Sequence, residues 1–95
     1  MIVGTLTVDL SIRQARSLKD KRRVVQSLKE RIRARFAVAI AEVDHLDNPQ
    51  RAQLGIAVVG TDRRVLESVL GRVERYAARD SEALLTQCET DFLWG

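Results

Sequence analysis

In the first dozen residues apolar and polar residues alternate strictly, and this pattern is compatible with few folds. Apolar or small residues occupy every second position, at Ile2, Gly4, Leu6, Val8, Leu10 and Ile12. Polar residues stand between them, at Thr5, Thr7, Asp9 and Ser11. Because successive side chains of a strand point to opposite faces, this period of two predicts a strand with one buried face.

The spacing then changes to that of a helix. Ser17 can cap a helix that begins at Leu18, and good helix formers continue to Arg35. One apolar stripe runs along this helix, made of Leu18, Val25, Leu28, Ile32 and Phe36. A second helix is predicted after Gly60-Thr61-Asp62, with apolar positions at Leu66, Val69, Leu70, Val73 and Ala77.

Three more strands are predicted, over residues 36–44, 51–59 and 84–94. Residues 45–50 contain Asp, Asn and Pro and are expected to form a loop. In the last strand one face is expected to point toward the helices, with Thr86, Cys88, Thr90, Phe92 and Trp94. The other face would then carry Leu85, Gln87, Glu89 and Asp91.

The predicted order is β-α-β-β-α-β, which favours a ferredoxin-like α+β sandwich in a single domain, residues 1–95. Four antiparallel strands would carry both helices on one face of the sheet. The other face would hold small or mildly polar side chains. It is either exposed to solvent or packed against a second copy, which would make the protein a homodimer.

Charge is concentrated on the first predicted helix. Ten lysines and arginines lie between Arg13 and Arg35, against only Asp20 and Glu30, so this segment has a formal charge of +8. The remaining 72 residues sum to −5, because the whole chain is +3. Such a field attracts polyanions. We therefore predict an RNA-binding surface made of Arg13, Arg16, Lys19, Arg22, Arg23, Lys29 and Arg33; the alternative is a helix face that is merely solvated.

Lys21 differs from the other cations because the helical wheel places it inside the apolar stripe. One interpretation is an ion pair with Asp9, Glu42 or Asp91, because a buried ammonium without a partner is costly. The other is a lysine that faces a ligand at the sheet edge, as an accessory RNA contact. His45 and Arg51 are further accessory candidates, although residues 44–50 could equally be a solvated turn.

The sequence offers little for catalysis or for a cofactor. It has no phosphate-cradling glycine loop and no CxxC motif, and its one histidine cannot build a multi-histidine metal site. We therefore expect no enzyme activity, no cofactor and no metal. No apolar run approaches the roughly 20 residues of a membrane span, and we expect no membrane partner. The single cysteine, Cys88, suits a reducing cytoplasm.

Several strings of the chain resemble the bacterial YlxP-like family, domain of unknown function 503. They are Arg16-Ser17-Leu18-Lys19-Asp20-Lys21-Arg22-Arg23-Val24-Val25, Ala41-Glu42-Val43-Asp44-His45, Gln50-Arg51-Ala52 and Leu54-Gly55-Ile56-Ala57-Val58-Val59. The resemblance implies a small ferredoxin-like cytoplasmic protein of bacteria. Members are often encoded near genes for translation and ribosome maturation, which implies work on RNA, although the family has no established activity.

These observations lead to one expectation and one alternative. The first is a non-enzymatic RNA-associated module that docks structured RNA, in a ribosomal subunit or its precursor, through the basic first helix. Base stacking on the open sheet face is not expected, because no aromatic residue is assigned to that face. The alternative is a dimeric protein-interaction scaffold whose basic helix binds an acidic partner.

Overall fold

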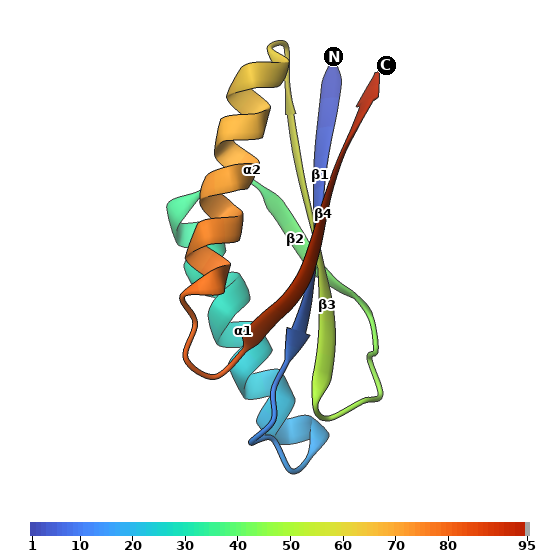
Figure 1. Cartoon of the computed structure of the whole chain (residues 1–95), viewed down its shortest axis with the longest axis vertical. Helices are drawn as coiled ribbons and strands as arrows, with labels where there is room; N and C mark the ends of the chain where they lie inside the picture. The colour runs from blue at the N-terminus through green and yellow to red at the C-terminus, as the bar shows by residue number, and fades with distance from the viewer. Residues whose placement is uncertain (95) are drawn as a thin grey trace.

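The computed structural model describes residues 1–94, with the side chains of residues 1–93. The six elements follow the predicted order: β1 Ile2–Ser11, α1 Leu18–Arg35, β2 Ala39–Asp44, β3 Arg51–Gly60, α2 Arg63–Ala78 and β4 Leu84–Trp94. The strands form one antiparallel sheet in the order β2-β3-β1-β4. Both helices lie on the same face of this sheet (Figure 1). The α+β fold and its β-α-β-β-α-β topology are therefore as predicted.

Local hydrogen bonds explain where the two helices begin. The Ser17 hydroxyl accepts from the backbone N–H of Asp20 at 3.1 Å, and the Asp20 carboxylate accepts from the backbone N–H of Arg16 at 3.0 Å. This reciprocal pair satisfies two donors that a helix start leaves free. At the start of α2, the Asp62 carboxylate accepts from the backbone N–H of Arg64 at 2.9 Å. Both caps are at the predicted positions.

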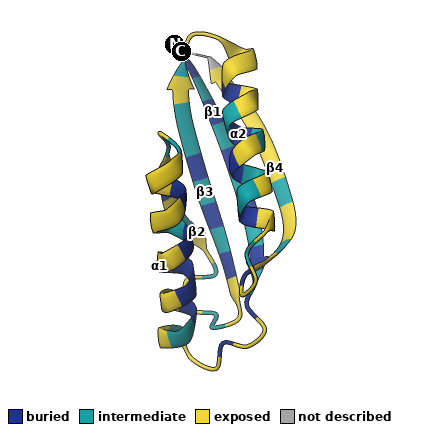
Figure 2. Ribbon diagram, turned by 90° about the vertical axis from the view of Figure 1, so that its left-hand side faces the viewer, coloured by how far each residue is buried: buried dark blue, intermediate teal, exposed yellow. Residues whose placement is uncertain are grey.

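The core lies between the sheet and the helices. Buried and half-buried residues alternate along the whole of β1, which is a central strand, as the striped ribbon in Figure 2 shows. Its inward side chains meet the apolar stripes of both helices. The fully buried members include Leu6, Val8, Leu10, Leu28, Ile32, Leu70 and Val73. Packing of these two stripes on one sheet face leaves the opposite face open.

The predicted facing of β4 is wrong at its beginning. Asp9 of β1 pairs with Gln87, but the next residue, Leu10, pairs with Leu85, so the strand has a bulge at Thr86. One extra residue inverts the alternation. Leu85 therefore packs against the core instead of facing outward, and Thr86 is exposed instead of facing the helices. Cys88 and Phe92, beyond the bulge, pack against the core as predicted; the side chain of Trp94 lies outside the described residues.

Strand β2 begins at Ala39 rather than at residue 36, because Phe36 ends α1. The backbone N–H of Phe36 donates to the carbonyl of Ile32 at 2.9 Å, as the last helical hydrogen bond does. A second bulge lies in β2, where Glu42 pairs with Leu54 but Asp44 pairs with Gln53. Glu42, before the bulge, shares the helix side of the sheet with Ile40, and its carboxylate meets Lys21 of α1 there.

Candidate nucleic-acid interface

Four cations of α1 form the basic stripe, which consists of Lys19, Arg22, Lys29 and Arg33. Positions three, four and seven apart share one face of a helix, and this stripe covers about 20 Å of helix length. Lys19, Arg22 and Arg33 are exposed, and Lys29 is half-buried. Among the described side chains, no carboxylate forms an ion pair with any of the four.

Two further contacts shape the basic stripe. The Arg33 guanidinium donates to the backbone carbonyl of Ile40 at 3.0 Å, which places this end of the stripe beside the edge strand β2. The two acids of α1 have other partners: the Glu30 carboxylate accepts from Gln26 at 3.1 Å, and the Asp20 carboxylate accepts from the backbone N–H of Arg16 at 3.0 Å. The charged ends of Lys19, Arg22 and Lys29 are thus available to an external anion.

The other predicted RNA contacts are placed differently. Arg13 and Arg16 are exposed in the connection between β1 and α1, next to the Lys19 end of the stripe. Arg23 lies on the side of α1 that faces α2, where it forms an ion pair with Glu82 at 3.4 Å. Both partners are more than half exposed, so this pair contributes little and can exchange for another anion.

Lys21 is buried, with its side chain only 1% exposed. Its ammonium donates to the Glu42 carboxylate and to the carbonyl of His45, both at 2.8 Å, and to the carbonyls of Leu46 and Arg51, both at 3.2 Å. The structure therefore confirms the first interpretation of Lys21, an ion pair, and its partner is Glu42. An ammonium so placed cannot touch RNA; it ties the loop between β2 and β3 to α1.

The two other residues predicted as accessory RNA contacts, His45 and Arg51, lie in the loop after β2 and at the start of β3. His45 is half-buried and has a φ of 60°, in the left-handed region that side chains seldom adopt. Its carbonyl accepts from both Lys21 and the backbone N–H of Asn48. Arg51 offers its carbonyl to Lys21 and keeps its side chain exposed. Only the Arg51 side chain thus projects freely toward a partner.

A second basic cluster was not predicted, and it lies between the two helices. The arginine pocket is a cavity of about 280 Å³ lined by Arg35, Phe36, Arg72, Arg75, Tyr76 and Arg79. Arg72 and Arg75 of α2 and Arg79, which caps the end of that helix, are spaced three and four residues apart, and this spacing in the sequence indicates a basic face. The sequence does not indicate that Arg35 and Phe36 line the same pocket, because their place there depends on how α1 packs against α2.

An ion pair beside this pocket joins α1 to the turn that follows α2. Arg31 of α1 donates to Asp80 at 2.7 Å, and the Asp80 side chain is only 6% exposed. Burial raises the pKa of Asp80, but hydrogen bonds from Arg31 and from the backbone N–H groups of Ala83 and Glu82 outweigh it, so the pKa lies below its usual value. The hydrogen bond to Asp80 in turn raises the pKa of Arg31.

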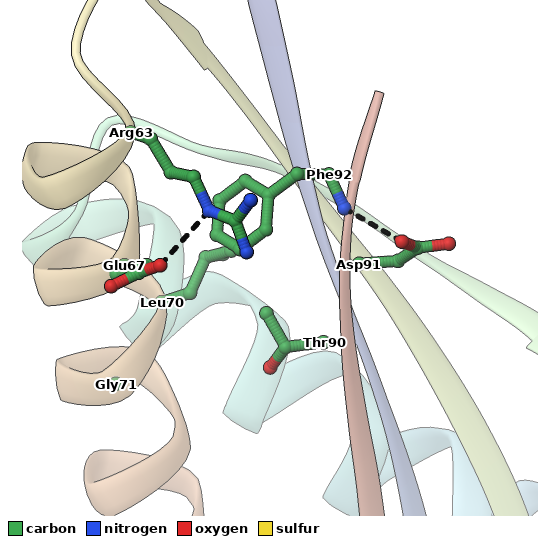
Figure 3. Close-up of a pocket in the computed structure, with 7 residues that line it drawn as sticks. All are labelled: Arg63, Glu67, Leu70, Gly71, Thr90, Asp91 and Phe92. Carbon is green, nitrogen blue, oxygen red and sulfur yellow. Dashed lines mark hydrogen bonds and ion pairs between the residues drawn. The ribbon is translucent and has the colours of Figure 1, made fainter. Parts of the chain in front are cut away.

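Another cavity, of about 430 Å³, lies between α2 and β4 (Figure 3). Its one arginine, Arg63, donates to Glu67 at 3.0 Å and stacks over Phe92, with 4.5 Å between the guanidinium carbon and the ring centroid. Asp91 also lines this cavity. Because the cation is already paired and a second acid is present, this cavity is poorly suited to a polyanion.

The open sheet face carries an apolar groove of about 530 Å³ over β1, β2 and β3. It is lined by Thr5, Leu6, Thr7, Ala39, Ile40, Ala41, Val43, Gly55, Ile56 and Ala57. Val43 covers Gly55: a Cβ at Gly55 would lie only 3.0 Å from the Val43 side chain. Beside the groove, Val3 pairs with Val59 on one side and with Leu93 on the other, which makes an apolar row across the sheet.

Two absences hold within the described part of the chain. Residues 1–94 contain no helix with the length and apolar character that crossing a membrane requires. In the same residues no three His, Cys, Asp or Glu side chains gather to form a metal site. Asp44 instead accepts from the backbone N–H of His45 at 2.7 Å.

Comparison with known proteins places the chain in a family. Residues 3–90 match the family model described as protein of unknown function (DUF503). The chain is also 36% identical over 72 residues to the uncharacterized protein YlxP of Bacillus subtilis (strain 168), an alignment that covers 76% of this chain and 78% of that protein. The match spans β1 to most of β4, and the chain accordingly belongs to the DUF503 family.

Proposed function

We propose that this protein is a non-enzymatic RNA-associated module that works in the cytoplasm. It docks structured RNA, in a ribosomal subunit or its precursor, through the basic stripe. The observation that carries the proposal is that Lys19 and Arg22, which are exposed, and Lys29, which is half-buried, have no carboxylate partner among the described side chains. Unpaired cations in a row on a rigid helix suit the phosphates of a folded RNA, where contacts set position rather than read bases.

The flanking residues extend this surface. Arg13 and Arg16 continue it past the start of α1, and Arg23 can leave its exposed pair with Glu82 when a phosphate is near. Arginine side chains add specificity of shape, because each guanidinium can donate two parallel hydrogen bonds to phosphate oxygens.

The open sheet face is a poor rival for RNA. Asp9, Glu89 and Asp91 lie in its outward register, and Phe36, Tyr76 and Phe92 are on the helix side. Acids repel phosphates, and none of the described aromatic rings lies on this face to stack bases. RNA binding through the helix face is therefore the arrangement that we propose.

Two variants that each neutralise two cations test the interface. Lys19→Gln with Arg22→Gln changes the basic stripe, and Arg63→Gln with Arg64→Gln makes the same change in net charge at the start of α2. Glutamine is a good helix former, and at position 63 it avoids placing a second carboxylate beside Glu67. We expect the first variant to bind purified ribosomal RNA at least about tenfold more weakly, and its salt dependence to fall by about two units of slope.

The control variant should bind RNA within about threefold of the wild type, because its changes lie at the far end of the molecule from the stripe. Binding measured by filter retention over a salt series gives both quantities. Equal losses in the two variants would show that only net charge matters and would remove the proposed interface.

A second candidate function is supported by the apolar groove and the apolar row on the open sheet face. Val43, Val59 and Leu93 are each more than half exposed there. A second copy of the chain, packed face to face, would cover these side chains. In this alternative the protein is a dimeric scaffold, and the basic stripe receives an acidic protein instead of RNA.

A further inference from the structure

The arginine pocket between the helices gathers four guanidinium groups around two aromatic rings. Arg35 reaches it from the end of α1, next to Phe36. Arg72 and Arg75 reach it from α2, next to Tyr76, and Arg79 reaches it from the position that caps the end of α2. All four arginines are exposed, and both rings are half-buried.

The rings hold two of the arginines in place. The guanidinium carbon of Arg35 lies 4.7 Å from the centroid of the Tyr76 ring, and that of Arg72 lies 5.5 Å from the centroid of the Phe36 ring. The two rings contact each other edge to face, with centroids 6.1 Å apart. A guanidinium stacked on a ring keeps its N–H edge free, so the donors are positioned before a ligand arrives.

The positive charge of the pocket is not neutralised from within the described part of the chain. No acidic side chain lines the pocket, and none of its four arginines forms an ion pair there. The nearby acid Asp80 is engaged by Arg31. Like charges three and four residues apart on a helix destabilise one another, as Arg72, Arg75 and Arg79 must. The cavity of Figure 3 differs, because Glu67 pairs with its arginine.

We propose that the arginine pocket binds a small anion that carries two or more adjacent phosphate groups. Four guanidinium forks offer more donors than one phosphate can accept, whereas a diphosphate or triphosphate presents enough oxygen atoms for all of them. The cavity, at about 280 Å³, is also smaller than most sites for drug-sized apolar ligands. The anion comes either from a free nucleotide or from the phosphorylated end of an RNA chain, which share this chemistry.

This site is independent of the basic stripe. Arg33 belongs to the stripe and Arg35 to the pocket, and a step of two positions turns by about 200° around the axis of α1, so the two side chains leave the helix on nearly opposite sides. The stripe lies on the β2 side of the helix and the pocket on the α2 side. Loss of RNA binding at the stripe would therefore leave the pocket intact, and the reverse also holds.

Calorimetric titration of the full chain with sodium pyrophosphate tests the proposal. Arg79→Gln is the test variant and Arg64→Gln is the matched control, since each removes one exposed arginine, at an end of α2, that has no ion pair among the described residues. We expect pyrophosphate to bind Arg79→Gln about tenfold or more weakly than the wild type, as loss of a charged hydrogen bond predicts. Arg64→Gln should stay within about twofold of the wild type, because its side chain lies outside the pocket.

Two further measurements make the result decisive. Orthophosphate should bind at least about tenfold more weakly than pyrophosphate, because it offers fewer acceptors. Arg79→Gln should unfold at a temperature no lower than the wild type in the absence of ligand, since it relieves repulsion. Equal affinity for the two anions, equal losses in both variants, or no heat of binding to the wild type would each overturn the proposal.

A nucleoside diphosphate and an RNA oligonucleotide with a 5′-triphosphate identify the source. If the oligonucleotide competes with pyrophosphate more strongly than the nucleotide does, the ligand is an RNA end; the opposite order assigns the site to a free nucleotide. An oligonucleotide with a 5′-hydroxyl should not compete in either case.

Discussion

At the scale of single residues, Lys21 shows how one charge can serve the fold instead of binding. Its ammonium is surrounded by one carboxylate and three carbonyls, from Glu42 and from the loop that follows. Three of these acceptors belong to the backbone, so the lysine does more than form an ion pair. It also supports the left-handed conformation of His45, whose carbonyl it binds.

Lys21→Met should therefore be strongly destabilising. The change leaves Glu42 charged and only 14% exposed, and it removes a donor from three carbonyls. Breaking one side of a buried pair costs about 3–5 kcal/mol in the free energy of unfolding, measured in urea. Lys19→Met is the control and should change stability by less than about 0.5 kcal/mol, because Lys19 is exposed. A Lys21→Met protein as stable as the control would contradict the structural role.

Cys88 illustrates the opposite case, a residue with a reactive group but no sign of a reactive role. Hydrogen bonding with Glu74, followed by burial, raises the pKa of the Cys88 thiol above its usual value. The thiol therefore stays protonated near neutral pH, and a protonated thiol is a poor nucleophile. Its half-buried position on the core side of β4 fits a packing role.

At the scale of elements, α1 is held from three directions. Its apolar stripe packs on the sheet, Lys21 ties it to the loop after β2, and Arg31 ties it to the end of α2 through Asp80. Asp80 also accepts from the backbone N–H groups of Glu82 and Ala83, at 3.0 and 2.7 Å, and so shapes the turn that leads into β4. One carboxylate thus joins two helices and a turn.

The pH dependence of stability should reveal this carboxylate. The pKa of Asp80 is lowered by folding, so its contribution is fully present above the ordinary value of 3.8 and is lost as the pH falls through the lower folded value. Asp80→Asn should lose about 1–3 kcal/mol of unfolding free energy at neutral pH, the usual range for hydrogen bonds to a charged group. The loss should shrink in acid, where the wild type has lost the same contribution.

Asp47→Asn is the matched control for this measurement. Asp47 is an exposed acid of the loop after β2, and its replacement should change stability by less than about 0.5 kcal/mol at any pH. Thermal unfolding between acid and neutral pH compares the three proteins. A constant difference between Asp80→Asn and the wild type across that range would refute the assignment.

At the scale of the whole molecule, the two sides of the sheet differ in character. The helix side carries the basic stripe and the arginine pocket, whereas the open side carries an apolar groove, an apolar row and several acids. A polyanion and a second copy of the chain would therefore approach from opposite sides. RNA binding at the stripe and pairing of two copies through the open face therefore use different surfaces, and each can be tested without disturbing the other.

Self-association is tested by two valines that are similarly exposed. Val59 belongs to the apolar row and is 60% exposed, and Val65 lies in the first turn of α2 and is 56% exposed. If the open face pairs two copies, Val59→Glu should weaken the dimer at least about tenfold, since the two-fold axis brings the new charge in twice. Val65→Glu should not. Sedimentation that shows a monomeric wild type at every concentration would exclude the dimer.

The features that could be predicted from the sequence are those with local causes. The order of the six elements, the bounds of α1 and both helix caps follow from the spacing of apolar residues and from side chains that bond to their own neighbours. The separation of charge is also written in the sequence, because ten cations between Arg13 and Arg35 share one helix and its approach. Membership of the DUF503 family agrees with the resemblance seen there.

The features that only the tertiary structure decided depend on contacts between distant segments. The bulge at Thr86 is set by pairing with β1, so the alternation of β4 alone could not place Leu85. The sequence offered three acids as partners of Lys21. The pairing of β2 with β3 places Glu42 on the helix side of the sheet, where it meets Lys21 of α1. The arginine pocket exists because α1 ends against the C-terminal half of α2, which brings Arg35 and Phe36 to residues some forty positions away along the chain. Local periodicity determines which face of an element is apolar, but long-range packing determines which faces meet.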